Sequence, residues 1–281
     1  MAYALMMMVA DMNPVAVPAN AAVASHSDLG TERDSNEDAC GIHLDDAGSV
    51  LVVVADGVSG YEGGEIASRT AVDVTIAAYC ESPPSWGPAK RIFRAVQRAN
   101  IEIYDRTLVV PELRRMSCTV TAVLVHDGVA YGAHVGDSRL YLVRGGSIVQ
   151  KTKDHTVTAE RVRLGLLSAE RAKSHPDRST LTHSLGPELI AAIDRLSFPL
   201  EKDDALIICT DGLYNVIEDD ELAAVGSHDE PTAACAELVN RANARGTPDN
   251  LTVAMIRCLA GAPASPSSTG WRSVLGQIFS R

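Results

Sequence analysis

The sequence predicts an α+β fold in which antiparallel β-sheet is layered against helices. Three observations lead to this class: short apolar or alternating runs of strand length, turn dipeptides between them, and long amphipathic helices kept apart from the strands. The chain has 281 residues, of which 46% are hydrophobic. A chain of this length and composition can bury one large core.

The strands are expected mainly in the middle of the chain. Residues 50–55 (VLVVVA) are an apolar run that ends at Asp56-Gly57, and residues 205–209 and 251–259 are two further apolar runs. Between them, DG and GG turns separate four shorter runs, at 118–126, 129–135, 139–143 and 147–150. Short strands joined by such turns predict an antiparallel meander.

Two long helices are expected between the first strand and the meander. One covers residues 65–79, and the other begins at Pro88, which suits the first turn of a helix, and carries an apolar stripe to about residue 103. Two more helices are expected near residues 219–225 and 232–244. Residues 156–184 are polar, rich in Arg and Ser and without a strong period, so they are a candidate flap beside a site.

The ends of the chain have a different character from the middle. Residues 1–22 are interpreted as a flexible leader, because their apolar stretch lacks a basic start and is interrupted by Asp11 and Pro14. Residues 23–260 are expected to form one folded domain, followed by a linker at 261–270 (GAPASPSSTG). Residues 271–281 predict a short amphipathic tail helix, with apolar side chains at Trp271, Val274, Leu275, Ile278 and Phe279.

Charge and cysteine usage narrow the possible partners and the compartment. The formal net charge of −11 argues against nucleic acid as a partner, because phosphate backbones bind to basic surfaces. The six cysteines form no CxxC pair, so neither a disulfide framework nor a zinc site is indicated. A reducing cytoplasm is the expected location. No run approaches the ~20 apolar residues that span a bilayer.

The most informative pattern is the position of the aspartates. Asp38, Asp56, Asp137, Asp211 and Asp249 all lie at the ends of expected strands or in the turns between them. A single Asp-Gly after a strand is usually only a turn. Several aspartates at strand ends can converge, however, and only a bound cation makes that convergence favourable.

The expected ligands are all oxygen atoms, which favours Mg²⁺ or Mn²⁺ over zinc. The carbonyl of Gly57 can approach such an ion closely, because glycine has no side chain. Two ions ~4 Å apart can share one water, lower its pKa and direct it at phosphorus. Arg33 is the best candidate to hold the phosphate, since a guanidinium can bind two phosphate oxygens at once. Without the acidic cluster, Arg33 would be interpreted as an exposed loop arginine.

Seven segments, in order, resemble the motif series of the type 2C metal-dependent Ser/Thr protein phosphatases, in particular bacterial-type members. They span roughly residues 24–259 and read SDLGTERDSNEDA (27–39), ADGVSGYEGGEIAS (55–68), VGDSRLYLV (135–143), KDHT (153–156), HPDRSTLTHSLG (175–186), CTDGLYNV (209–216) and PDNLTV (248–253). A single DG or GDSR is weak as a signal, whereas seven ordered matches are specific.

The resemblance implies a four-layer α-β-β-α sandwich of two antiparallel sheets flanked by helices. It also implies a phosphatase in which a metal-bridging water attacks phosphoserine or phosphothreonine in proteins, opposing a Ser/Thr kinase. By position, Asp56 would bridge two Mn²⁺ or Mg²⁺ ions and the Gly57 carbonyl would bind the first. Asp211 and Asp249 would hold the second ion, with Glu37 and Asp38 close by and partly acting through water. Asp137 would serve a possible third ion, and Arg33 would bind phosphate.

Some positions depart from the family pattern. Val58 stands where many eukaryotic members have a His proposed as general acid, although bacterial-type members often have Met or Val. Ser59 replaces a usual Gly, and Ser117-Cys118-Thr119 replaces the usual Gly-Thr-Thr; both changes are expected to affect loop shape more than ligand chemistry. His155 is expected to make a structural hydrogen bond, with a proton shuttle as the alternative.

Alternatives remain open from the sequence. The chain could be a pseudo-enzyme that uses the fold only to bind a partner, although intact Asp56, Asp211, Asp249 and Arg33 argue against it. It could also act on a single regulatory protein, such as an anti-sigma antagonist. The tail could dock on a membrane or partner through Trp271, Ile278 and Phe279, or simply pack on its own domain.

Overall fold

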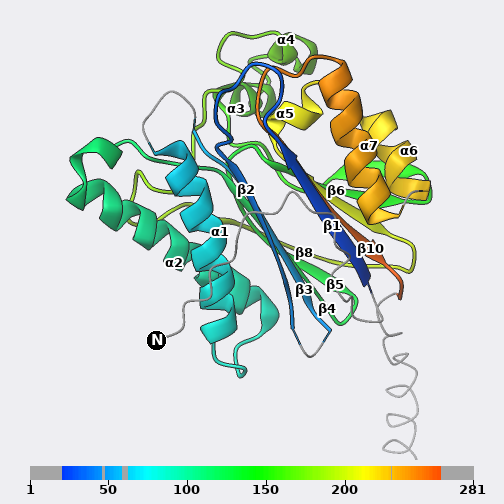
Figure 1. Ribbon diagram of the computed structural model, residues 1–281, viewed down its shortest axis with the longest axis horizontal. Helices are drawn as coiled ribbons and strands as arrows, with labels where there is room; N and C mark the ends of the chain where they lie inside the picture. Colours follow the sequence, from blue (N-terminus) through cyan, green and yellow to red (C-terminus); the bar gives the residue numbers. More distant parts are fainter. Residues whose placement is uncertain (1–20, 46–47, 59–62, 229, 261–281) are drawn as a thin grey trace, which may run out of the picture.

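Two five-stranded antiparallel sheets form the centre of the computed structural model, which describes residues 21–45, 48–58, 63–228 and 230–260 (Figure 1). The first sheet has, in order across it, β1 (Ala21–Asp28), β10 (Leu251–Cys258), β9 (Ala205–Cys209), β6 (Arg139–Arg144) and β7 (Ser147–Gln150). The second has β2 (Asp38–Leu44), β3 (Val50–Asp56), β4 (Val120–His126), β5 (Val129–Val135) and β8 (Asp194–Pro199).

Helices cover the outer face of each sheet. Helices α1 (Gly64–Glu81) and α2 (Pro88–Val109) pack on the second sheet, while α6 (Asp219–His228) and α7 (Pro231–Ala244) pack on the first (Figure 1). One apolar cluster fills the space between the sheets, and each helical layer adds another. The expected four-layer α-β-β-α sandwich is therefore confirmed.

The packing of β3 explains why its sequence is apolar throughout and does not alternate between apolar and polar residues. Val50, Val52 and Val54 belong to the cluster between the sheets, whereas Leu51 and Val53 belong to the cluster beneath α1 and α2. Both faces of the strand are buried, so neither face selects polar residues.

The predicted meander at 118–150 is wrong in its connectivity. β4 pairs with β5 and β6 pairs with β7. However, β5 and β6 lie in different sheets, because β5 also pairs with β8 and β6 also pairs with β9. The turn at Gly136-Asp137 carries the chain from one sheet to the other. Gly136 has a positive φ of 106°, and an added Cβ would lie 2.5 Å from the Thr119 side chain, so this crossing requires glycine.

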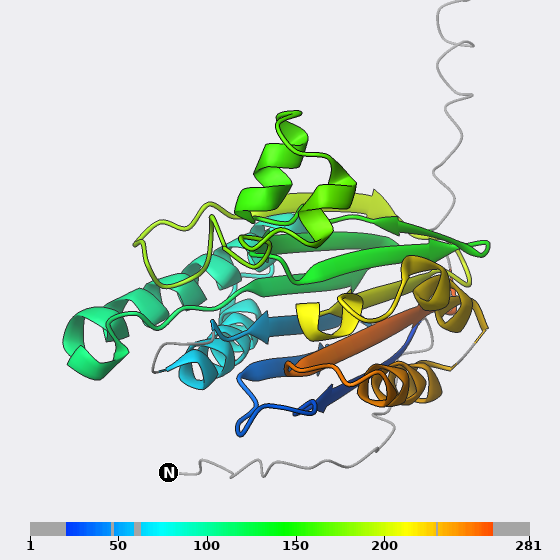
Figure 2. The same cartoon turned by 90° about the horizontal axis from the view of Figure 1, so that it is seen from above.

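The flap segment contains more regular structure than its sequence predicts. Helices α3 (Val157–Arg163) and α4 (Ala169–Lys173) are each capped by a hydroxyl, from Thr156 and Ser168 respectively. These helices are too short for an apolar period to be visible in the sequence. Figure 2 shows them projecting from the body of the molecule, and Figure 1 places them near α5 (Asp211–Tyr214), at one end of the strands.

The N-terminal boundary is also corrected by the structure. β1 begins at Ala21, and Ala21 and Ala22 pair with Cys258 and Arg257 of β10. The leader expected at 1–22 therefore included two residues that belong to the sheet. Residues 1–20, the linker at 261–270 and the amphipathic tail at 271–281 lie outside the described residues. Within the described part of the chain, none of the helices has the length and apolar character to cross a membrane.

Candidate metal and phosphate site

The expected metal-ligand aspartates come to one end of both sheets. Asp56 ends β3 and Asp38 begins β2, where the two residues are directly opposite each other in the antiparallel register. In the other sheet, Asp211 follows β9, and Asp249 precedes β10 at the same edge, because Cys209 pairs with Val253. Asp137 lies at this edge too, since Arg139 also pairs with Cys209.

A side-chain hydrogen bond from Thr210 is among those that join the two sheets at this end. The Thr210 hydroxyl donates to Oδ2 of Asp38 at 2.8 Å and accepts the Thr252 N–H at 2.9 Å. Asp38, in β2 of the second sheet, is thereby linked to the end of β9 and to β10 of the first sheet. Thr210 was missed as a site residue by the sequence analysis, although it lies inside the CTDGLYNV segment.

Burial and neighbouring negative charges raise the pKa of three of these aspartates, Asp56, Asp38 and Asp211. Burial raises the pKa of Asp56 well above its usual range, and the negative charges of Asp38, Asp211, Asp137 and Asp249 raise it further. Burial, aided by Asp211 and Asp249, raises the pKa of Asp38 to about 7. The pKa of Asp211 rises to about 6, again from burial first and then from the charge of Asp249.

Asp137 belongs to the same electrostatic cluster. Burial and then the charge of Asp211 raise its pKa well above the usual range. The Tyr214 hydroxyl donates to the Asp137 carbonyl at 3.1 Å, and the Arg139 guanidinium stacks over the Tyr214 ring, 3.7 Å from its centroid. Arg139 in turn pairs with Asp154 at 2.6 Å, so a partly buried network holds the turn that carries Asp137.

The donor chemistry fits a hard divalent cation. Like charges placed directly opposite on neighbouring strands destabilise a sheet, so the Asp38–Asp56 pair needs a compensating positive charge. Among the residues that the structure describes, no three His, Cys, Asp or Glu side chains approach closely enough to hold an ion as they stand. Mg²⁺ usually keeps several waters and takes only one or two carboxylates directly, so a spread arrangement of carboxylates remains compatible with it.

Gly57 is enclosed by backbone. An added Cβ would collide with the Gly64 carbonyl oxygen and would lie 2.8 Å from the Glu37 carbonyl oxygen. Its N–H donates to Glu37 O at 3.1 Å, and it forms an isolated bridge with Cys118. The conformation of this residue, and therefore the direction of its carbonyl, is fixed from two sides.

Arg33 lies beside the aspartates in the loop between β1 and β2. Its Nη2 donates to Oδ2 of Asp249 at 2.9 Å. The loop is held by Asn250, which accepts the Glu37 N–H at 2.8 Å and donates to Leu29 O at 2.9 Å. Asn250 is a second site residue to which the sequence analysis assigned no role, even though it follows Asp249.

His155 has a structural environment. Its Nδ1 accepts the Gly136 N–H at 3.1 Å, and its Nε2 lies 3.5 Å from Oδ2 of Asp194. Its ring lies between those of His134 and His183, with both centroid distances at 5.0 Å. These contacts favour the structural interpretation of His155 over the proton shuttle.

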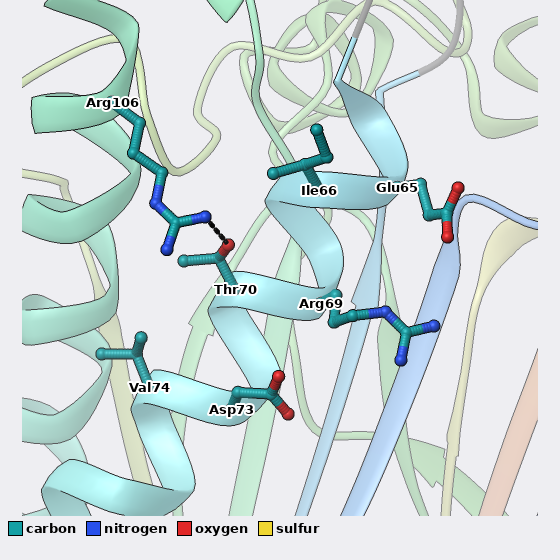
Figure 3. A pocket seen from close by; sticks show the side chains of 7 residues that line it. All are labelled: Glu65, Ile66, Arg69, Thr70, Asp73, Val74 and Arg106. Atoms are coloured by element: carbon teal, nitrogen blue, oxygen red, sulfur yellow. Dashed lines mark hydrogen bonds between the residues drawn. The ribbon is translucent and has the colours of Figure 1, made fainter. Parts of the chain in front are cut away.

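A separate hollow lies between α1 and α2. Figure 3 shows its lining, which is Glu65, Ile66, Arg69, Thr70, Asp73, Val74 and Arg106. The Arg106 guanidinium donates to the Thr70 hydroxyl at 3.2 Å across it. None of the expected metal or phosphate ligands lines this hollow.

Comparison with known proteins identifies the family. The protein phosphatase 2C family model matches residues 25–253. The chain belongs to the protein phosphatase 2C family. The expected activity, that of a metal-dependent protein Ser/Thr phosphatase, is confirmed by this membership.

Curated relatives and solved structures agree with the assignment. A putative protein phosphatase 2C-type of Streptococcus pyogenes is 34% identical over 82% of this chain and 94% of its own length. Serine/threonine phosphatase stp of Listeria monocytogenes is 30% identical over 82% and 93%. The Mycobacterium tuberculosis serine/threonine phosphatase PstP/Ppp superimposes with a TM-score of 0.77 at 29% identity, covering 85% of this chain and 99% of that one. A structure of the PstP catalytic domain in complex with two manganese ions has a TM-score of 0.74 at 26% identity, covering 85% and 98%.

Proposed function

We propose that this phosphatase 2C dephosphorylates phosphoserine and phosphothreonine in proteins at the aspartate cluster described above. The observation that carries the proposal is the direct opposition of Asp38 and Asp56 at the ends of β2 and β3, with three further aspartates around them. Burial and neighbouring negative charges raise the pKa of Asp38, Asp56, Asp137 and Asp211, and the convergence of these carboxylates has no structural benefit without a cation.

The ligands of the proposed centre have different roles. The negative charges of all four other aspartates raise the pKa of Asp56, which supports its position at the centre of the cluster, where it would bridge two Mn²⁺ or Mg²⁺ ions. Asp211 and Asp249 would hold the second ion, and the Gly57 carbonyl would bind the first. Asp38 has one oxygen occupied by Thr210, which supports a contribution partly through water. Asp137 would bind a possible third ion.

When bound, the metal ions lower the pKa of a water molecule and so supply the nucleophile. The protein's own part is to orient the phosphate and to stabilise the charge that develops on it. Arg33 is suited to this, since it stands beside Asp249 and can turn its fork of N–H donors to a phosphate. Val58 has no ionisable group, so the proton for the leaving serine or threonine oxygen comes from another group.

The two manganese ions in the PstP structure support Mn²⁺ as the ion to test first. We also propose that a Ser/Thr protein kinase opposes this enzyme, a relation supported by the serine/threonine phosphatases among its relatives. Phosphoproteins that accumulate in a strain lacking the chain, and that the purified enzyme dephosphorylates, would identify its substrates. Broad activity on unrelated phosphopeptides would count against a single dedicated substrate.

The proposal is tested by hydrolysis of p-nitrophenyl phosphate and of a phosphothreonine peptide with Mn²⁺, with and without chelator. Asp211→Asn should abolish metal-dependent turnover of both substrates. Asp220→Asn is a matched control, because it makes the same change of charge at an exposed position of α6. No metal-dependent turnover in the native protein would favour the partner-binding alternative, whereas unchanged turnover in Asp211→Asn would show that the aspartate cluster is not the site of hydrolysis.

A further inference from the structure

The flap and the proposed metal site are joined by a short ladder of backbone hydrogen bonds. Cys118 forms bridges to Gly57 on one side and to Leu185 on the other. Leu185, which directly follows the flap, donates to Cys118 O at 2.9 Å and accepts the Cys118 N–H at 3.3 Å. On the other side, Val58 donates to Ser117 O at 3.0 Å, and Thr119 donates to Asp56 O at 2.8 Å.

This ladder is buried and closely packed. Cys118 and Leu185 are both fully buried. Gly186 has a positive φ of 109°, and an added Cβ there would lie 2.6 Å from Met116 O and 2.8 Å from Ile103. The chain that leaves the flap is therefore pressed against the segment that supports Gly57, without space for another atom.

One side chain holds this arrangement from outside the ladder. Asn100 of α2 is fully buried, and each of its polar atoms is used. Its Oδ1 accepts the Gly186 N–H at 3.0 Å, and its Nδ2 donates to Glu188 O at 2.8 Å and to Leu189 O at 3.1 Å. The segment that Asn100 holds is otherwise peripheral, since Leu189 and Ile190 are largely exposed.

We propose that Asn100 is a positioning residue for the metal centre, acting through Gly186, Leu185 and Cys118 on the backbone at Asp56 and Gly57. This inference rests on the proposed function, because it assumes that the Gly57 carbonyl and Asp56 bind the ions. Without the Asn100 amide, the segment after the flap loses three hydrogen bonds, and Leu185 is no longer fixed against Cys118. The ladder then sets the direction of the Gly57 carbonyl less strictly, and the first ion binds more weakly.

The test is direct Mn²⁺ binding to the full chain, measured by calorimetry, together with the Mn²⁺ concentration that gives half-maximal phosphatase activity. Asn100→Ala should weaken Mn²⁺ binding about 10-fold, the lower end of what removal of a group that orients metal ligands costs. If Asn100→Ala does not fold, Asn100→Leu serves instead, because it keeps nearly the same size and removes the hydrogen bonds without burying a charge. Excess Mn²⁺ should restore much of kcat in either variant.

Two controls separate positioning from loss of stability. Gln97→Ala removes a more distant contact from the same helix to the same loop, Nε2 to Leu189 O at 3.4 Å, and should leave Mn²⁺ binding unchanged. Leu238→Val perturbs a fully buried side chain of α7 in the other helical layer, and should lower the melting temperature without changing Mn²⁺ affinity.

The inference is overturned if the Asn100 variants lower only the melting temperature, as Leu238→Val does, and bind Mn²⁺ as the native protein does. That result would leave the proposed function intact as long as Asp211→Asn still loses metal-dependent turnover. If Asp211→Asn retains that turnover, the proposed metal centre itself is wrong.

Discussion

The Nη2 of Arg33 donates a hydrogen bond of 2.9 Å to Oδ2 of Asp249, joining the expected phosphate ligand to an expected metal ligand across 216 positions of sequence. Both side chains are about one-third exposed, at 37% and 35%, so this pair is open to substrate and solvent. A pair so exposed adds little to stability. Its significance is geometric, because it places the guanidinium at the edge of the aspartate cluster.

Arg33→Ala should lower kcat/KM for a phosphothreonine peptide by about 10- to 100-fold, because hydrogen bonds to charged groups contribute about 1.5–3 kcal/mol. Arg33→Lys keeps the charge but loses the fork, so we expect an intermediate value. Steady-state kinetics at saturating Mn²⁺ provide the measurement. Arg69→Ala, which removes an exposed arginine of α1, is the control. Equal kcat/KM in native protein and Arg33→Ala would exclude Arg33 as a phosphate ligand.

Asp38→Asn should stabilise the metal-free protein while weakening Mn²⁺ binding. Asp38 is opposite Asp56, and burial together with Asp211 and Asp249 raises its pKa to about 7. At pH 8 a neutral amide therefore removes a buried charge, yet its oxygen can still accept the Thr210 hydroxyl. Thermal unfolding in chelator and in Mn²⁺ measures both effects.

The exposed Asp220→Asn should change neither the stability in chelator nor the stabilisation by Mn²⁺. A lower melting temperature of Asp38→Asn in chelator would show that the Asp38 carboxylate is not under repulsion.

The aspartates could be predicted from the sequence because each one adjoins a strand that is apolar enough to recognise. Asp56 and Asp211 follow runs whose residues are all buried. β1 and β8 were not predicted as strands because they are edge strands with partly exposed residues, so they lack a continuous apolar run. The crossing at Asp137 could not be predicted, because a tight turn between strands looks the same whether or not the strands pair.

Contacts between distant segments account for what the sequence missed in the site. Thr210 gains its role only because Asp38 lies 172 positions away in sequence and 2.8 Å away in space. Asn100 likewise acts on Gly186, which is separated from it by 86 positions. Neither residue has a local pattern that distinguishes it from a threonine that ends a strand or an asparagine within a helix.

Gly57→Ala should destabilise the protein and disturb the metal site together. The new methyl group would collide with the backbone oxygens of Gly64 and Glu37, which cannot move as a side-chain end can. Overpacking of this kind costs about 1–3 kcal/mol. Urea unfolding and Mn²⁺ calorimetry are the measurements. Gly87→Ala is the control, because Gly87 has a φ of −64° and no atom within 4 Å of an added Cβ. A Gly57→Ala protein with native stability and Mn²⁺ affinity would contradict the enclosed geometry.

His134 should make the protein less stable as the pH falls from about 6.5 to 4. The ring is fully buried, with Nδ1 2.9 Å from the Thr121 hydroxyl and Nε2 3.0 Å from Lys153 O. Burial, with a smaller effect of His155, lowers its pKa from 6.5 to about 4. Between these values the unfolded chain binds the proton and the folded chain does not, so the free energy of unfolding falls as the pH falls.

The contribution of His134 to this loss should reach about 3 kcal/mol near pH 4, at about 1.4 kcal/mol for each pKa unit. His134→Gln should be less stable than the native protein at pH 7, because it repacks a buried site, but its stability should depend less on pH between 6.5 and 4. Urea unfolding in chelator, which excludes metal release, measures the difference. His228→Gln, at the exposed end of α6, should keep the native pH dependence. Parallel pH profiles for His134→Gln and the native protein would show that another group causes the loss.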